Sequence, residues 1–111
     1  MISLDSVFPM SLEKSKQVAP FHFYISIGKY AGLSAASYED FVKMITQVKA
    51  ESLNFHLERG DFEKWATDSL RDKKLTKEIA KIRDRKLRGL TLRNLLYRTV
   101  SNRLKEITNK R

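Results

Sequence analysis

The sequence contains no cysteine, which excludes disulfide bonds, thiolate zinc sites and cysteine nucleophiles and favours a reducing compartment. Glycine and proline are also scarce, with four and two residues. No two glycines are adjacent, so the chain has no glycine-rich loop of the kind that cradles a phosphate. We expect one domain, because 111 residues fall within the ~100–200 residues typical of a single domain.

Long apolar runs are absent as well. A membrane-spanning helix needs about 20 consecutive apolar residues, and the apolar runs here are only a few residues long. Residues 1–17 lack the basic region and following apolar stretch that mark a signal peptide. We therefore expect a soluble, cytoplasmic protein with no membrane span.

Acidic residues are few in the second half of the chain, and the net charge of +9 is concentrated there. Residues 1–60 carry six basic and six acidic side chains, whereas residues 71–111 carry fifteen basic and four acidic ones. Like charges at this density repel each other, so such a segment favours an anionic partner. Nucleic acid, an acidic protein and an anionic membrane surface all meet that description.

The N-terminal third contains one strand-like segment. Apolar side chains alternate with polar ones from Phe21 to Ile27, which is the period of a half-buried strand. A lone strand leaves its backbone unpaired, so it needs either Ile2–Phe8 or the same segment of a second subunit as its partner. The competing interpretation is a helix with Pro20 at its first position. We interpret residues 1–19 as a loosely ordered lead-in and Gly28–Ala36 as a connection.

The remaining chain has apolar residues at intervals of three and four, as in amphipathic helices. Ser37, with Asp40 three residues later, resembles a capping box and predicts a helix start. A second helix is expected over roughly Ala50–Arg59, with Gly60 ending it in the left-handed conformation. Asp61, Asp72 and Thr91 are the predicted caps of the third, fourth and fifth helices. The sequence predicts a mostly α fold over residues 20–111, a compact bundle of about five helices, and leaves room for a short N-terminal strand pair.

Three stretches share a pattern with known proteins. They are FHFYISIGKYAGLSAASYEDF, SLNFHLERGDFEKW and RDKKLTKEIAKI, and their central motif is S-L-x-F-H-x-x-R-G-D-F-x-x-W. The chain therefore resembles a family of small domains of unknown function found mainly in archaea and some bacteria. The matching positions are Phe21, Phe23, Ala36, Ser37, Phe41, Ser52, Leu53, Phe55, His56, Arg59, Gly60, Asp61, Phe62, Trp65, Asp72, Leu75 and Ile79.

The resemblance covers about residues 21–82 and implies a compact helical module. It implies no established activity, and no catalytic residue carries over from it. The chain departs from the family pattern at Arg71, where the family usually has glycine, and at Thr76, where a small residue is common.

One cluster invites a catalytic interpretation. His56, Arg59, Asp61 and Trp65 lie within ten residues of each other, and a histidine held by an aspartate can act as a general base. No nucleophile, second acid or phosphate loop accompanies them. We therefore favour a structural role, in which these residues fix the junction between two helices, and expect no enzyme activity.

Metal binding is disfavoured by the same spacing argument. The two histidines, His22 and His56, are far apart, and no Asp-x-Asp or His-x-x-x-His pattern occurs. We expect no metal site and no cofactor.

The basic half of the chain contains the predicted binding surface. Cationic side chains recur every three or four residues from Lys74 to Arg88, which predicts a positive stripe along one helix. Further cations follow on the next helix. The candidate nucleic-acid-binding residues are Lys74, Lys77, Lys81, Arg85, Arg88, Arg93, Arg98 and Lys105.

Function is therefore expected to be non-catalytic binding of a DNA or RNA backbone, largely without sequence preference. No zinc finger, RNA-recognition aromatic motif or helix-turn-helix that would read bases is evident. One alternative is a protein-interaction adaptor, or a homodimer, that uses residues 21–27. A solvated charged face and a basic helix lying on anionic lipid also remain open.

Overall fold

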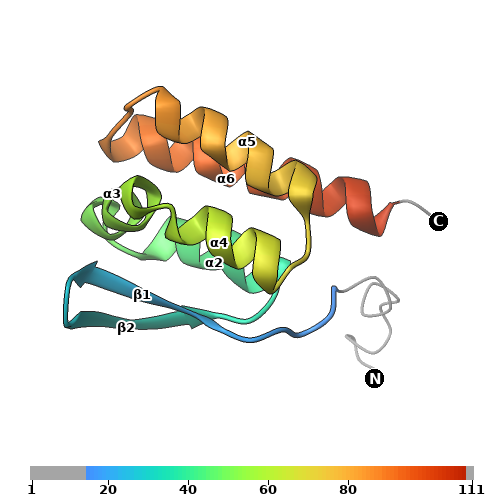
Figure 1. The fold of residues 1–111 in the computed structure, drawn as a ribbon, viewed down its shortest axis with the longest axis horizontal. Coiled ribbons are helices and arrows are strands. Elements are labelled where there is room, and N and C mark those ends of the chain that lie inside the picture. Colours follow the sequence, from blue (N-terminus) through green and yellow to red (C-terminus); the bar gives the residue numbers. More distant parts are fainter. Residues whose placement is uncertain (1–14, 110–111) are drawn as a thin grey trace, which may run out of the picture.

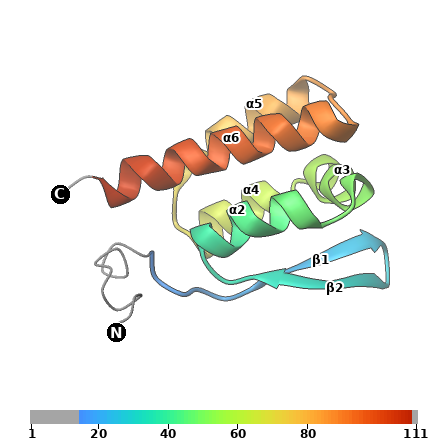
Figure 2. The same ribbon diagram turned by 180° about the vertical axis from the view of Figure 1, so that it is seen from behind.

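A computed structural model of the protein describes residues 15–109. The elements in chain order are β1 (Phe21–Ser26), β2 (Lys29–Ala35), α2 (Tyr38–Gln47), α3 (Ala50–Arg59), α4 (Asp61–Asp68), α5 (Lys73–Asp84) and α6 (Gly89–Thr108). The hairpin β1–β2 forms one layer, helices α2, α3 and α4 the middle layer, and α5 with α6 the outer layer (Figure 1). The reverse view shows α6 lying along α2 (Figure 2). The predicted mostly α fold with a short strand pair is confirmed.

The strand predicted from Phe21 to Ile27 is present over Phe21–Ser26, but its partner was not predicted. β1 pairs antiparallel with β2 through the two-residue turn Ile27–Gly28, so the prediction of a connection over Gly28–Ala36 is wrong. Residues 29–35 lack alternation and include glycine, alanine and serine, which have little β propensity, and their pairing with β1 holds them in the sheet. The predicted partner Ile2–Phe8 lies outside the described residues.

The chain before β1 is tied to the helices. The backbone N–H of Ser15 donates to Glu39 at 2.9 Å, and that of Val18 donates to the Ala36 carbonyl at 2.8 Å. The indole Nε1 of Trp65 donates to the Ala19 carbonyl at 2.8 Å. Residues 15–19 of the predicted lead-in therefore pack on the domain, and the rest of that lead-in lies outside the described residues.

Helix starts follow the predicted caps in two cases and depart from them in two. Ser37 Oγ accepts from the Asp40 N–H at 3.1 Å, and Asp72 Oδ1 accepts from the Leu75 N–H at 3.0 Å, as predicted. Asp61 is not a cap, because Gly60, at φ 78, both ends α3 and precedes α4. Thr91 is not a cap either, since α6 begins two residues earlier, at Gly89.

An aromatic cluster joins the hairpin to the helices. Phe23, Phe41 and Phe62 are fully buried. The ring centroids of Phe41 and Phe62 are 5.3 Å apart, and those of Phe21 and Phe23 are 4.9 Å apart. Because these rings come from β1, α2 and α4, burying them together holds the three elements in one arrangement. The apolar faces of α5 and α6, with Leu75, Ile79, Ile82, Leu92, Leu96 and Val100, continue the core on the other side of the middle layer.

A buried carboxylate links the helical layers. Asp72 is 4% exposed, and its Oδ2 accepts from the Tyr38 hydroxyl at 2.7 Å and from Arg103 Nε at 2.8 Å. Burial acts to raise the pKa of Asp72, but hydrogen bonds from Arg103, the Leu75 N–H and Tyr38 outweigh it and hold the pKa below its usual value. One side chain therefore caps α5 and connects it to α2 and α6.

We expect Asp72→Asn to lower the free energy of unfolding by about 1–3 kcal/mol, because it removes the buried charge that accepts hydrogen bonds from Arg103 Nε, the Tyr38 hydroxyl and the Leu75 N–H. Urea unfolding followed by circular dichroism measures the loss. Asp84→Asn is the matched control, since Asp84 is exposed and forms no ion pair within residues 15–109. A loss no larger than that of the control would contradict the linking role of Asp72.

The link between α4 and α5 contains a strained residue. Arg71 has φ 55, in the left-handed region that favours glycine, and the next N–H, that of Asp72, donates to the Ala66 carbonyl at 2.9 Å.

Arg71→Gly should therefore raise the free energy of unfolding by about 0.5–1 kcal/mol, because glycine adopts positive φ without steric cost. Lys73→Gly, two residues later in the first turn of α5, is expected to be neutral or destabilising. Thermal unfolding of both variants tests the difference, and a lower midpoint for Arg71→Gly would show that the conformation is not strained.

Candidate nucleic-acid interface

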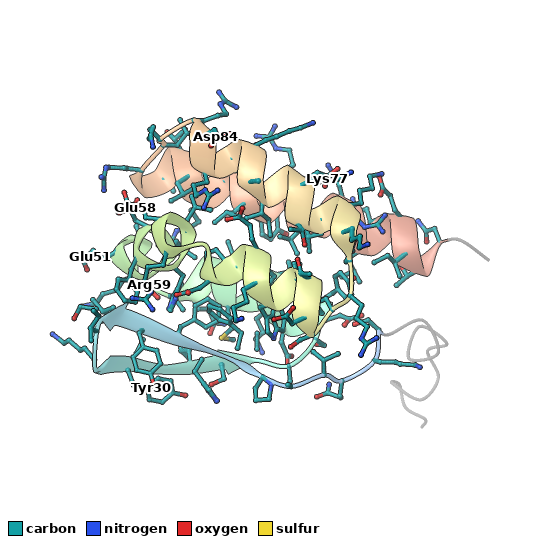
Figure 3. The ribbon with its side chains drawn as sticks, in the orientation of Figure 1. Tyr30, Glu51, Glu58, Arg59, Lys77 and Asp84 are labelled. Atoms are coloured by element: carbon teal, nitrogen blue, oxygen red, sulfur yellow. The ribbon has the colours of Figure 1, made fainter. Side chains whose placement is uncertain are left out.

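The outer side of α5 carries a row of cations. Lys73, Lys77, Lys81 and Arg85 are spaced four residues apart, all four are exposed, and none forms an ion pair within residues 15–109. Arg85 keeps a helical backbone at the end of α5. Figure 3 shows Lys77 and Asp84 on this outer side of the helix. Residues four apart are neighbours on a helix surface, so the row runs over about 18 Å of helix length.

Helix α6 contributes a second group of cations. Arg98 and Lys105 are exposed and form no ion pair among the described residues. They flank Asn102, which lies four residues after Arg98 and three before Lys105, on the same face of α6. Two neighbouring helices therefore present unpaired positive charge to solvent.

The other predicted binding residues are engaged within the fold. Lys74 Nζ lies 2.9 Å from a carboxylate oxygen of Glu106, and Arg88 lies 3.3 Å from Glu58. Arg93 donates to the carbonyls of Ile45 and Thr46, at the end of α2. Arg93 therefore stabilises a helix end. Lys74 and Arg88 are exposed but paired, so the predicted set divides into cations with a partner in the fold and cations that form no ion pair within residues 15–109.

A groove runs between α5 and α6. Its volume is about 450 Å³, and its lining includes Lys81 and Arg85 from α5 and Leu95, Thr99 and Asn102 from α6. The two helices are antiparallel, since a short turn joins them at one end and the Lys74–Glu106 pair connects them near the other. The last two cations of the α5 row, Lys81 and Arg85, thus form part of one wall of this groove.

The sequence analysis missed two of these features. Lys73 was not among the predicted binding residues, although its spacing of four from Lys77 is visible in the sequence. The groove position of Thr99 has no sequence signal, because it depends on how α5 and α6 pack.

The cluster around His56 is a structural clamp. His56 Nε2 accepts from the Tyr24 N–H at 2.8 Å, and Ser52 Oγ donates to the Tyr24 carbonyl at 2.8 Å. Because Nε2 accepts, Nδ1 carries the proton and donates to Asp61 Oδ2 at 2.8 Å. Asp61 also accepts from Arg59 Nε at 3.0 Å. Both ring nitrogens of His56 are thus occupied in holding β1 against α3.

Burial lowers the pKa of His56, and its hydrogen bond to Asp61 only partly opposes this shift. The ring is 4% exposed. A neutral imidazole whose free lone pair accepts a backbone N–H is not available as a general base in this arrangement. The cluster therefore joins α3 to β1 as well as to Asp61 at the start of α4, whereas the sequence predicted a junction between two helices alone.

A larger groove, about 710 Å³ in volume, lies beside the clamp. Its lining includes His22 and Tyr24 from β1, Phe55 and Arg59 from α3, and Trp65 from α4. The Arg59 guanidinium carbon lies 5.1 Å from the centre of the Phe55 ring. The residues that line this groove belong to β1, α3 and α4 and the turns beside them; these elements lie in different layers from α6 (Figure 1).

Within residues 15–109, no three histidine, aspartate or glutamate side chains gather as a metal ion would require. In the same part of the chain, no helix has the length and hydrophobicity needed to cross a bilayer.

Comparisons of the chain with protein-family models, with curated proteins and with solved structures found no match. The resemblance to the small archaeal and bacterial domain family therefore stays a prediction. Function has to be argued from the geometry alone.

The clamp predicts a pH dependence. Because the pKa of His56 in the folded state is below its ordinary value of 6.5, the unfolded chain takes up a proton more readily. The contribution of His56 to stability is therefore present above pH 6.5 and falls as the pH drops below it. An NMR titration of the His56 ring should give a pKa below 6.5, and a value at or above 6.5 would contradict the clamp.

Proposed function

We propose that the protein binds nucleic acid through the phosphate backbone, using the outer surface of α5 and α6. The observation that carries this proposal is the row of Lys73, Lys77, Lys81 and Arg85, which is exposed and unpaired within residues 15–109. Like charges four residues apart each cost an isolated helix about 0.2–0.5 kcal/mol. An anionic polymer lying along the row removes that repulsion.

The engaged cations give a contrast that supports this proposal. Lys74, Arg88 and Arg103 each form an ion pair with a carboxylate of the chain. Acidic partners are therefore present for the cations that connect one element to another. The row on α5, together with Arg98 and Lys105, has none among the described residues. A solvated charged face that served stability through ion-pair networks would show the opposite pattern.

Binding of this kind is electrostatic. Lysine and arginine contacts to phosphates fix a protein on nucleic acid without reading its sequence, and each contact releases counterions. The affinity is therefore expected in the micromolar range at moderate salt and falls steeply as salt rises.

The alternative function, a protein-interaction surface at residues 21–27, has few exposed apolar side chains available to it. Phe21 and Phe23 are 8% and 0% exposed and belong to the core. Within residues 21–30, the large apolar side chains that are exposed are Ile27 (83%) and Tyr30 (50%), at the end of the hairpin. An adaptor or a homodimer would have to use that tip.

Charge reversal tests the proposed function. The triple variant Lys77→Glu, Lys81→Glu and Arg85→Glu should bind labelled DNA and RNA duplexes at least tenfold more weakly, as measured by fluorescence anisotropy. Each lost phosphate contact should also lower the salt slope by about one. Circular dichroism should show an unchanged fold, because all three side chains are exposed.

The matched control reverses Lys29, Lys43 and Lys49, which are also exposed and lie on other elements. Both triple variants lower the net charge of +9 by the same six units. Equal loss of binding in the two variants would mean that total charge and not the α5 surface is responsible. Absence of binding in the unmodified protein would overturn the proposed function.

A further inference from the structure

We infer that the ligand is double-stranded RNA, held across the groove between α5 and α6, and that Thr99 and Asn102 select it over DNA. This inference rests on the proposed function and names the polymer that the same surface takes. It follows from the neutral hydrogen-bonding side chains that lie between the cations as well as from the cations themselves.

Neutral hydrogen-bonding groups stand between the two sets of positive charge. Thr99 and Asn102 line the groove, with Lys81 and Arg85 on the α5 side and Arg98 and Lys105 adjacent on α6. Neither the Thr99 hydroxyl nor the Asn102 amide forms a hydrogen bond within residues 15–109. Both groups can donate and accept, and both are therefore open to a polar ligand.

The ribose 2′-hydroxyl matches these two groups. It is both a donor and an acceptor, and it distinguishes RNA from DNA at a given site. When cations on either side hold the phosphates, the groups between them face the sugars. DNA would cover Thr99 and Asn102 without offering a hydroxyl, which leaves desolvated polar groups unpaired and costs affinity.

The groove lining also favours a duplex over a single strand. Single-strand binding depends on aromatic side chains on which unpaired bases stack, and none of the residues that line this groove is aromatic. An A-form duplex needs no such platform, because its wide, shallow minor groove displays the 2′-hydroxyls between two phosphate backbones.

Two carboxylates in the groove set the local balance of charge. Glu106 is paired with both Lys74 and Arg103 at 2.9 Å, so its charge is compensated. Glu78 lines the same groove, is half-buried, and forms no ion pair among the described residues. Glu78 therefore repels a polyanion in the groove and serves as a probe of where the ligand lies.

The selectivity is tested by anisotropy with RNA and DNA duplexes of the same sequence and with single-stranded RNA. The unmodified protein should bind the RNA duplex about tenfold more tightly than the DNA duplex, which corresponds to about one hydrogen bond of ordinary strength. Thr99→Val combined with Asn102→Ala should remove that preference by weakening binding of the RNA duplex and tightening binding of the DNA duplex, which no longer leaves these two polar groups unpaired. Thr91→Val combined with Asn94→Ala is the control, because these exposed α6 residues do not line the groove.

The position of the ligand is tested by two single variants, each of which removes one negative charge from α5. Glu78→Gln should tighten RNA binding severalfold, whereas Asp84→Asn, which lies on α5 but outside this groove, should have a smaller effect. Equal effects would overturn the assignment of the groove.

The outcomes separate this inference from the proposed function. Salt-sensitive binding with equal affinity for RNA and DNA duplexes, or a preference for single-stranded RNA, would overturn the selection of double-stranded RNA while the proposed function stands. Binding to none of the three polymers at low salt would overturn both.

Discussion

The arrangement of the helices depends on the hydrogen-bonded ion pair between Asp72 and Arg103. The Asp72 carboxylate caps α5, accepts from Tyr38 of α2 and pairs with Arg103 of α6 at 2.8 Å. Burying a charge is costly unless it is paired and fully hydrogen-bonded, and every contact of Asp72 meets that requirement. Because Arg103 also pairs with Glu106, and Glu106 with Lys74, the network fixes α5 beside α6. The groove between these helices has its shape for this reason.

A second clamp attaches the hairpin to the helices. A two-stranded sheet exposes the outer edge of each strand and has little stability alone. Ser52 and His56, one turn apart on α3, bind the C=O and N–H of Tyr24 and so take the place of a third strand at that point. Both ring nitrogens of His56 are hydrogen-bonded, one to the Tyr24 N–H and the other to Asp61.

The sequence predicts local features well where one residue type dictates the backbone. Ser37, Gly60 and Asp72 were recognised from spacing alone, and the structure confirms their capping roles. Lys29–Ala35 was missed because pairing with β1, and not its own pattern, makes it a strand. Arg93, Arg103 and Thr99 have roles that depend on neighbours far away in sequence. No spacing rule predicts which cations form ion pairs within the fold. The sequence therefore places the candidate site on α5 and α6, but it does not tell the paired cations from the unpaired ones.

The central claim is that unpaired cations on α5 and α6 contact phosphates. The most direct measurement is the salt dependence of duplex binding by the unmodified protein, plotted as the logarithm of the binding constant against the logarithm of salt concentration. If three to six cations act, the slope should lie between about −3 and −5, at ~0.9 per phosphate neutralised. A slope near zero, or no binding at low salt, would contradict the account.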